Sequence, residues 1–231
     1  MHKKASLHTK RRGVVPPLFF EKSEYERIQK IRQKKVYFPH FRVSLVGRID
    51  TWKGQDILLE IAKKCQEDGI QNIHFSFFGT SSSYDPKTVM FEKSLHNFAK
   101  ENNLTNVSFH GYCEPETIFS ETNLLIHAST EHEPFGRTIA EAALIGIPII
   151  ASRFSGAAPY FSSLPYVRLI ENPRNIEEVF ALIVKAKEDF SAGPRFFLEG
   201  KELWKYFQDG RIRMTEIWQN TILPQRSPDK S

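Results

Sequence analysis

Residues 124–151 read LLIHASTEHEPFGRTIAEAALIGIPIIA, and this stretch decides the fold. The apolar run 124–128 predicts a strand, 136–145 predicts a helix, and the apolar run 147–151 predicts a second strand. A strand, a helix and a strand in this order are typical of a βαβ unit, which builds a parallel sheet. Both runs are apolar at nearly every position, as expected for strands that helices cover on both sides.

The same alternation continues on both sides of this stretch and predicts an α/β fold with a doubly wound parallel sheet. Further strands are predicted at 42–46, 74–78, 107–110 and 167–170. Helices are predicted at 56–67, from Pro86 onward, and at 114–121, 175–190 and 210–223. We therefore expect a basic tail and charged linker over 1–35, one sheet domain over 36–195, and a helical extension over 196–231.

Positive charge is concentrated at the N-terminus. The formal net charge of +5 is matched by Lys3, Lys4, Lys10, Arg11 and Arg12, and no acid occurs among the first twelve residues. The rest of the chain is formally neutral, and no stripe of basic and aromatic residues indicates binding to nucleic acid. We expect a solvated, frayed tail, with weak contact to an anionic membrane as the alternative.

Cysteine usage and hydropathy favour a cytoplasmic protein. Cys65 and Cys113 indicate neither a disulfide framework nor a zinc site, and they fit a reducing compartment. The longest apolar run, 142–151, is far shorter than the ~20 residues that cross a bilayer. The stretch 14–20 is too short and too interrupted by prolines for a secretion signal. We expect a cytoplasmic location, peripheral at the inner face of the membrane if the tail binds lipid.

Residues that follow the strands are the candidates for a site, because doubly wound sheets bind ligands outside the carboxyl ends of their strands. The first strand is followed by Gly47 and Arg48, and Lys53 comes just before the next helix. An arginine fork, a lysine and a helix N-terminus together suit a diphosphate. For this stretch alone, a solvent-facing loop with two ordinary cations fits equally well.

Two glutamates follow the strand at 124–128. Glu133 lies in the loop before the helix at 136–145, and Glu141 lies within that helix. The first-turn amides of a helix favour a phosphate or a polar sugar. A carboxylate one to two turns along can accept hydrogen bonds from both hydroxyls of a ribose. The alternative is a capped surface helix, with Glu133 near its positive end and Glu141 in solvent.

Taken in order, these motifs resemble glycosyltransferase family 4, a family of retaining transferases with the GT-B fold. The resemblance runs from about residue 14 to about residue 190 and implies a Rossmann-like domain equivalent to the C-terminal, nucleotide-sugar-binding half of a GT-B enzyme. The motifs that carry it are Gly-Arg…Lys-Gly at 47–54, Phe-Gly-Thr at 78–80, Phe-His-Gly at 109–111, Glu-Pro-Phe-Gly-Arg-Thr-Ile-Ala-Glu-Ala at 133–142 and Gly-Ile-Pro-Ile-Ile-Ala-Ser at 146–152.

The resemblance also implies roles for single residues. Arg48 and Lys53 would bind the donor diphosphate and stabilise the departing nucleotide. Glu133 would contact the donor sugar and support charge near its anomeric carbon, and Glu141 would bind the ribose. The remaining donor-binding positions that the resemblance implies are Gly47 and Gly79 at strand ends, Gly111 and Tyr112 at the base, with Tyr112 able to stack on it, and Phe135, Gly136 and Arg137, whose amides meet the sugar or phosphate.

No metal or cofactor is expected beside the nucleotide-sugar substrate, because the family stabilises the leaving group with these cations and the chain contains no Asp-x-Asp motif. One departure concerns the loop after the second strand, which reads Gly79-Thr80-Ser81 where the family usually has Gly-x-Gly. We expect this loop to be bulkier or to lie differently. The polar stretch 80–86 is also a candidate lid.

The half of a GT-B enzyme that binds the acceptor is expected to be missing. Residues 14–17, Val-Val-Pro-Pro, resemble the connection between the two domains, and only residues 1–13 precede them. None of the eight histidines matches the acceptor-side histidine that the family often uses. We interpret His110 and His127 as packing residues of their strands, and His132 as a residue that supports the site indirectly.

Several functions remain open. The first is retaining, metal-independent transfer of a sugar from a nucleotide-sugar to a glycan or lipid-linked acceptor, with the acceptor domain supplied by a separate polypeptide. The alternatives are a non-catalytic nucleotide-sugar-binding module and an inactive fragment of a longer glycosyltransferase. A sugar-nucleotide 2-epimerase fits less well, because Phe-Gly-Arg-Thr at 135–138 resembles the transferases.

Overall fold

One parallel sheet organises the protein. The computed structural model describes residues 26–27, 30–31, 40–133 and 136–191. Within them the strands follow the order β3-β2-β1-β4-β5-β6, and every neighbouring pair is parallel. The strands are β1 (Phe41–Val46), β2 (Ile73–Phe78), β3 (Val107–Gly111), β4 (Leu124–His127), β5 (Ile149–Ser152) and β6 (Val167–Ile170). This order confirms the predicted doubly wound sheet.

Helices connect consecutive strands, and their ends follow from local sequence. α3 begins at Pro86 because Asp85 caps it, with the Asp85 carboxylate accepting from the amide of Lys87 at 3.0 Å. α5 ends at Gly146, which takes the left-handed conformation with φ 82°. The helices are α2 (Gln55–Glu67), α3 (Pro86–Glu101), α4 (Pro115–Glu121), α5 (Arg137–Ile145), α6 (Ala158–Phe161) and α7 (Ile176–Ser191).

The predicted elements of the described region are all present, with ends shifted by at most two residues. The short helix α6 was not predicted. Strands covered by helices are expected to be apolar on both faces or nearly so, and the two edge strands depart from this: β3 has no fully buried residue, and β6 exposes Arg168. The predicted helix at 210–223 lies outside the described residues. The domain boundaries at 35 and 195 stay predictions.

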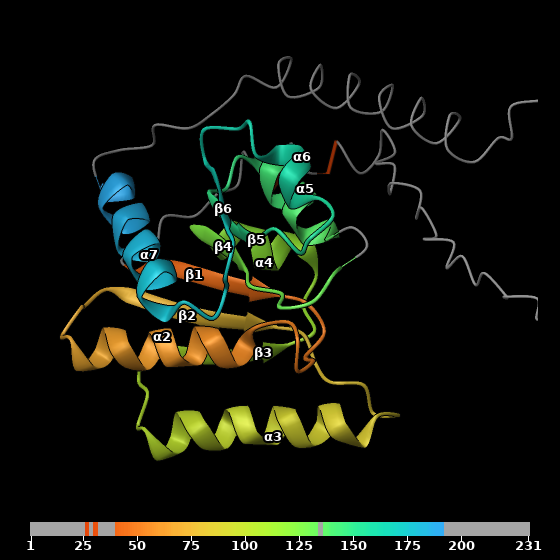
Figure 1. Ribbon diagram of the computed structural model, residues 1–231, viewed down its shortest axis with the longest axis vertical. Helices are drawn as coiled ribbons and strands as arrows, with labels where there is room; N and C mark the ends of the chain where they lie inside the picture. The colour runs from red at the N-terminus through yellow and green to blue at the C-terminus, as the bar shows by residue number, and fades with distance from the viewer. Residues whose placement is uncertain (1–25, 28–29, 32–39, 134–135, 192–231) are drawn as a thin grey trace, which may run out of the picture.

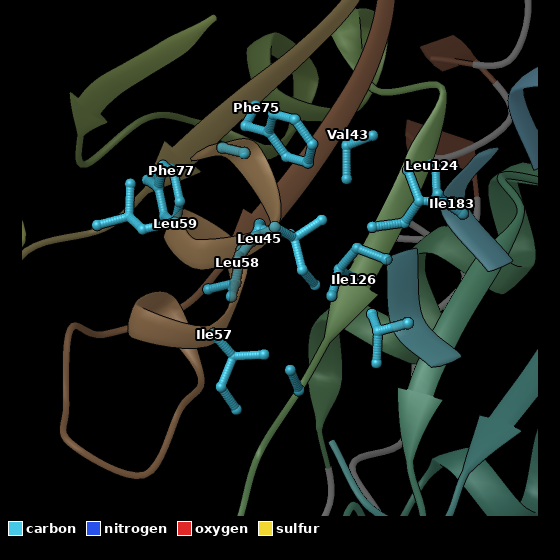
Figure 2. Close-up of a cluster of buried hydrophobic side chains, with 14 of the residues drawn as sticks. Val43, Leu45, Ile57, Leu58, Leu59, Phe75, Phe77, Leu124, Ile126 and Ile183 are labelled. Carbon is cyan, nitrogen blue, oxygen red and sulfur yellow. The ribbon is translucent and has the colours of Figure 1, made fainter. Parts of the chain in front are cut away.

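Two hydrophobic cores lie on opposite faces of the sheet. In one, Val43, Leu45, Phe75 and Phe77 from the sheet pack against α2 and α7 (Figure 2). In the other, α4, α5 and α6 pack against residues such as Phe78 and Leu125. Figure 1 shows the helices on both sides of the sheet. Because side chains alternate along a strand, β2, β4, β5 and β6 contribute residues to both cores, whereas the edge strand β3 packs only against the first.

The fold places one edge of the sheet in position for a ligand. β1 and β4 are neighbours although two strands separate them in the chain, and the connections leave their shared boundary in opposite directions. The loops after β1 and β4 therefore start side by side at the carboxyl edge and lead to helices on opposite faces of the sheet. Doubly wound sheets bind their ligands at such a point. In the described part of the chain, no helix is both long and apolar enough to span a membrane.

Candidate functional site

Lys53 and Glu133 form a buried ion pair at this point. The Nζ atom of Lys53 lies 2.7 Å from Oε1 of Glu133, and their side chains are only 13% and 15% exposed. Lys53 comes from the loop between β1 and α2, and Glu133 comes from the loop after β4. The ammonium also lies 4.2 Å from the centre of the Trp52 ring, a contact that favours a cation there.

The two loops meet because their backbones pack closely. The amide of Thr130 donates to the carbonyl of Trp52 at 2.8 Å. Gly54 has φ 82°, and a Cβ atom on it would lie 2.5 Å from the carbonyl oxygen of Ala128. A side chain at position 54 would therefore push the loop away from β4. Glycine here lets the preceding lysine reach Glu133.

The other oxygen of Glu133 is held by β4. Its Oε2 atom lies 2.7 Å from Nε2 of His127 and accepts from the hydroxyl of Ser129 at 3.2 Å. Burial alone raises the pKa of the Glu133 carboxyl, but the hydrogen bond and charge of His127, followed by those of Lys53, outweigh burial and hold the pKa at about 2. The carboxylate is therefore ionised at every physiological pH.

Backbone bonds fix Glu133 from the opposite side. Its amide donates to the carbonyl of Phe154 at 2.9 Å, and its carbonyl accepts from the amide of Gly156 at 3.0 Å. These bonds form a short parallel bridge to Ser155, in the loop after β5. Loops after two neighbouring strands thus hold one carboxylate in place, which is the preorganisation that an electrostatic site requires.

A cavity of about 590 Å³ opens at the carboxyl ends of β1, β2 and β3, and both Arg48 and Glu141 line it. Arg48 is 58% exposed and makes an ion pair with Asp50 at 3.1 Å. Apolar and aromatic residues form the rest of one wall, while the strand ends contribute backbone. Further lining residues are Gly47, Gly79, Tyr112, Pro115, Phe119 and Thr138. The size and the mixture of apolar walls with a few charged groups suit a small ligand.

Close backbone packing shapes the floor of this cavity. A Cβ atom on Gly79 would lie 2.1 Å from the carbonyl oxygen of Gly47, so only glycine fits there. The amide of Gly79 donates to the carbonyl of Gly111 at 2.6 Å. Glycines predicted as donor-binding positions therefore lie together at three adjacent strand ends, and they leave open space above the sheet.

Glu141 lies inside α5 but is not a solvated surface residue. It is 7% exposed and lines the cavity. The Nε atom of Arg137 donates to its Oε1 atom at 2.9 Å. α5 begins after Gly136, with no capping bond from a side chain in the described residues. The capped surface helix considered as an alternative is therefore wrong, because Glu133 faces Lys53 and Glu141 faces the cavity.

The loop after β2 is anchored to α3. The hydroxyl and the amide of Ser81 donate to the carboxylate of Glu92 at 2.5 Å and 3.2 Å. Thr80 and Tyr84 line the cavity mouth, and Tyr84 is 97% exposed. A serine in place of the second glycine thus gives this loop a tether. Whether the stretch 80–86 acts as a lid stays a prediction.

Four predicted positions remain: Tyr112, Phe135, Gly136 and Arg137. Tyr112 lines the cavity, is 76% exposed and donates to Glu114 at 3.2 Å, so its ring is accessible to a ligand. Phe135 lies outside the described residues. Gly136 and Arg137 lie at the start of α5, beside the cavity residue Thr138. Their amides as ligands of a sugar or phosphate stay a prediction.

One contact among the candidate residues was missed from the sequence. His127 was interpreted as a packing residue of its strand; it is buried there, and its ring also contacts the Glu133 carboxylate. The signal was its place as the last residue of the strand that precedes Glu133. His110 stacks on Phe78 as a strand residue should, with ring centroids 4.5 Å apart. His132 packs edge-on against Phe154.

Among the described residues, no three His, Cys, Asp or Glu side chains lie together in a way that could hold a metal ion. Cys65 and Cys113 are both free. The prediction of a metal-independent site stays open to a chelator test.

Residues 26–192 match the family described as glycosyl transferases group 1. An uncharacterized 41.2 kDa protein in the cps region of Klebsiella pneumoniae is 24% identical over 195 residues, which cover 83% of this chain and 48% of that protein. An uncharacterized 42.6 kDa protein in a Klebsiella pneumoniae cps region is 22% identical over 138 residues, or 60% of this chain and 33% of that protein. The chain thus spans about half the length or less of these curated relatives.

Solved structures give the same picture. HepE from Anabaena, in complex with UDP and glucose, is 25% identical with a TM-score of 0.59, covering 84% of this chain and 50% of HepE. Sucrose-phosphate synthase from Thermosynechococcus elongatus shares the fold at 21% identity and a TM-score of 0.57, covering 83% of this chain and 45% of the synthase. The chain therefore belongs to the group 1 glycosyl transferases, and its fold is that of about half of a GT-B glycosyltransferase.

Proposed function

We propose that this domain binds a nucleotide-sugar at the carboxyl edge of its sheet and transfers the sugar with retention and without a metal. The observation that carries the proposal is the meeting of Lys53 and Glu133 at 2.7 Å, in loops that follow strands of the same sheet whose carboxyl ends open onto a cavity lined by Arg48 and Glu141. Lys53 and Glu133 are not among the residues that line this cavity, so the proposed ligand extends from the cavity to the ion pair. HepE, which is similar over most of this chain, was solved with UDP and glucose.

The chain's own residues would act mainly by electrostatics and positioning. When the bond between the anomeric carbon and the diphosphate breaks, its electron pair stays on the phosphate oxygen, and Arg48 and Lys53 stabilise that charge. The Lys53 ammonium has three N–H donors and gives one to Glu133, so two remain for phosphate oxygens. Glu133 stays ionised and supports positive charge at the anomeric carbon. Glu141 accepts from the ribose hydroxyls.

The acceptor is a glycan or a lipid-linked sugar in this proposal, and an acceptor domain supplied by a separate polypeptide completes the cleft. Two relatives are encoded in a cps region, which supports a role in polysaccharide biosynthesis. Because the chain spans about half of its relatives, the donor side is the part that this domain can be tested for by itself.

A thermal-stability screen with UDP-, GDP- and ADP-sugars tests the donor side. A ligand at 100 times its dissociation constant stabilises the folded state by ~2.7 kcal/mol, and we expect one nucleotide class to raise the melting temperature clearly. Lys53→Ala should reduce this increase to about half or less, while Lys87→Ala, at the exposed start of α3, should leave it unchanged. Excess EDTA should change neither result. Stabilisation by none of the three classes would refute the proposal.

A further inference from the structure

His127 is a buried, titratable side chain for which the proposed function has no role. It is 5% exposed, and both of its ring nitrogens face oxygen atoms. Nε2 lies 2.7 Å from Oε2 of Glu133, and Nδ1 lies 3.5 Å from the hydroxyl of Ser129. An ionised carboxylate only accepts hydrogen bonds, so Nε2 carries a proton. The Ser129 hydroxyl also donates to Glu133, which leaves its oxygen lone pairs free to accept a second proton from Nδ1.

Protonation of His127 changes the charge of the whole cluster. The Glu133 carboxylate, from the loop after β4, contacts His127, and the Lys53 ammonium, from the loop before α2, lies across that carboxylate. With His127 neutral, the charges of Lys53 and Glu133 cancel. With His127 protonated, one carboxylate is divided between two cations, and the cluster carries one net positive charge.

We propose that His127 is a positioning residue: its protonated ring takes a share of the Glu133 carboxylate, so that Lys53 presents an uncompensated charge to the donor diphosphate. The inference rests on the proposed function and adds a residue to it. It predicts that the site binds nucleoside diphosphates more tightly at lower pH, where more of the His127 ring is protonated. A histidine that only packed in the strand would not couple proton uptake to ligand binding.

His127→Gln separates these two roles. The glutamine amide keeps an N–H donor for Glu133 but cannot gain a charge. We would measure binding of UDP, GDP and ADP by calorimetry at pH 6, 7 and 8 and form the ratio of wild-type to variant affinity, in which the titration of the ligand itself cancels. We expect the ratio to rise about five- to tenfold from pH 8 to pH 6, the order expected for one unit charge across a partly hydrated site.

The matched control is His74→Gln. His74 is a half-buried strand histidine that bonds to Ser108 at 2.9 Å, near the amino end of β2 and away from the cavity. The ratio of wild-type to His74→Gln affinity should stay constant with pH. Binding of the corresponding nucleosides, which lack the diphosphate, should also give a constant ratio for His127→Gln.

The outcomes distinguish the two proposals. If the wild type binds none of the three diphosphates, the proposed function fails. If it binds one and the ratio for His127→Gln is constant with pH, the inference about His127 is overturned and the proposed function stands. If the variant does not fold, NMR titration of the ¹⁵N-labelled histidines replaces it. Because coupling is reciprocal, one buried ring should stay protonated to higher pH when UDP is bound, and unchanged titration of every ring would overturn the inference.

Discussion

Glu133→Gln tests whether Lys53 and His127 hold an ionised carboxylate inside the site. The pKa of Glu133 is lowered from its ordinary 4.5 to about 2, and its side chain is only 15% exposed. One pKa unit corresponds to ~1.36 kcal/mol, so ionised Glu133 contributes about 3 kcal/mol to the free energy of unfolding at neutral pH. Glutamine has nearly the same shape and no proton to lose, so the pH-dependent part of this contribution disappears.

The sign follows from the direction of the shift. The pKa is lower in the folded state, so the unfolded state takes up protons first, and the contribution is lost as the pH falls from about 4.5 toward 2. Linkage gives about 3 kcal/mol at pH 5.5 and about 1 kcal/mol at pH 3. The difference in unfolding free energy between wild type and Glu133→Gln should therefore shrink by about 2 kcal/mol over this range.

Urea unfolding at half-unit pH steps between 3 and 5.5 measures this difference. The control is Glu67→Gln, which removes an exposed carboxylate whose ion pair with Lys63 lies within one helix. The difference in unfolding free energy between wild type and Glu67→Gln should not change with pH. A flat difference for Glu133→Gln as well would refute the claim that the two cations stabilise its ionised form.

Three further predictions concern the cavity and the loop contacts. Glu141→Ala should weaken nucleotide-sugar binding by roughly 1–3 kcal/mol, because ribose hydroxyls lose their acceptor, and calorimetry showing unchanged affinity would remove Glu141 from the ligand site. Lys53→Ala should weaken binding of a nucleoside diphosphate at least about tenfold and leave the nucleoside nearly unaffected, since only the diphosphate meets the ammonium; equal losses in a parallel titration would contradict that role. Gly54→Ala should lower the free energy of unfolding by about 2–4 kcal/mol, because its Cβ would lie 2.5 Å from the carbonyl oxygen of Ala128 at φ 82°; a loss under about 0.5 kcal/mol in urea would show that the loop yields easily.

The fold was predictable because its signals are local and repeat. Each buried strand is a short apolar run, and each long helix shows an apolar stripe at helical spacing. α6 was missed because four residues are too few for a periodic pattern. The exposure of β3 depends on its place at the sheet edge, which a strand's own sequence does not determine.

The sequence indicated candidate residues for the site but not the contacts between them. Arg48, Lys53, Glu133 and Glu141 were selected because they follow strands and match the family motifs. The ion pair between Lys53 and Glu133 joins residues far apart in sequence, and it depends on how closely two loop backbones pack. The role of His127 depends on the same geometry, because a histidine at a strand end packs, titrates or binds according to what faces it.

In the proposed diphosphate site, the pairing of the Lys53 cation with the Glu133 carboxylate has a physical reason. Lys53 and Glu133 are both largely buried, and either charge alone would be costly to desolvate. Paired, and with His127 holding the other carboxylate oxygen, they stay ionised and fixed before any ligand enters. A diphosphate then meets a lysine that already points in one direction and still has N–H donors to give. Little reorganisation remains to be done when charge develops on the leaving group, which is the condition under which fixed charges stabilise a transition state most effectively.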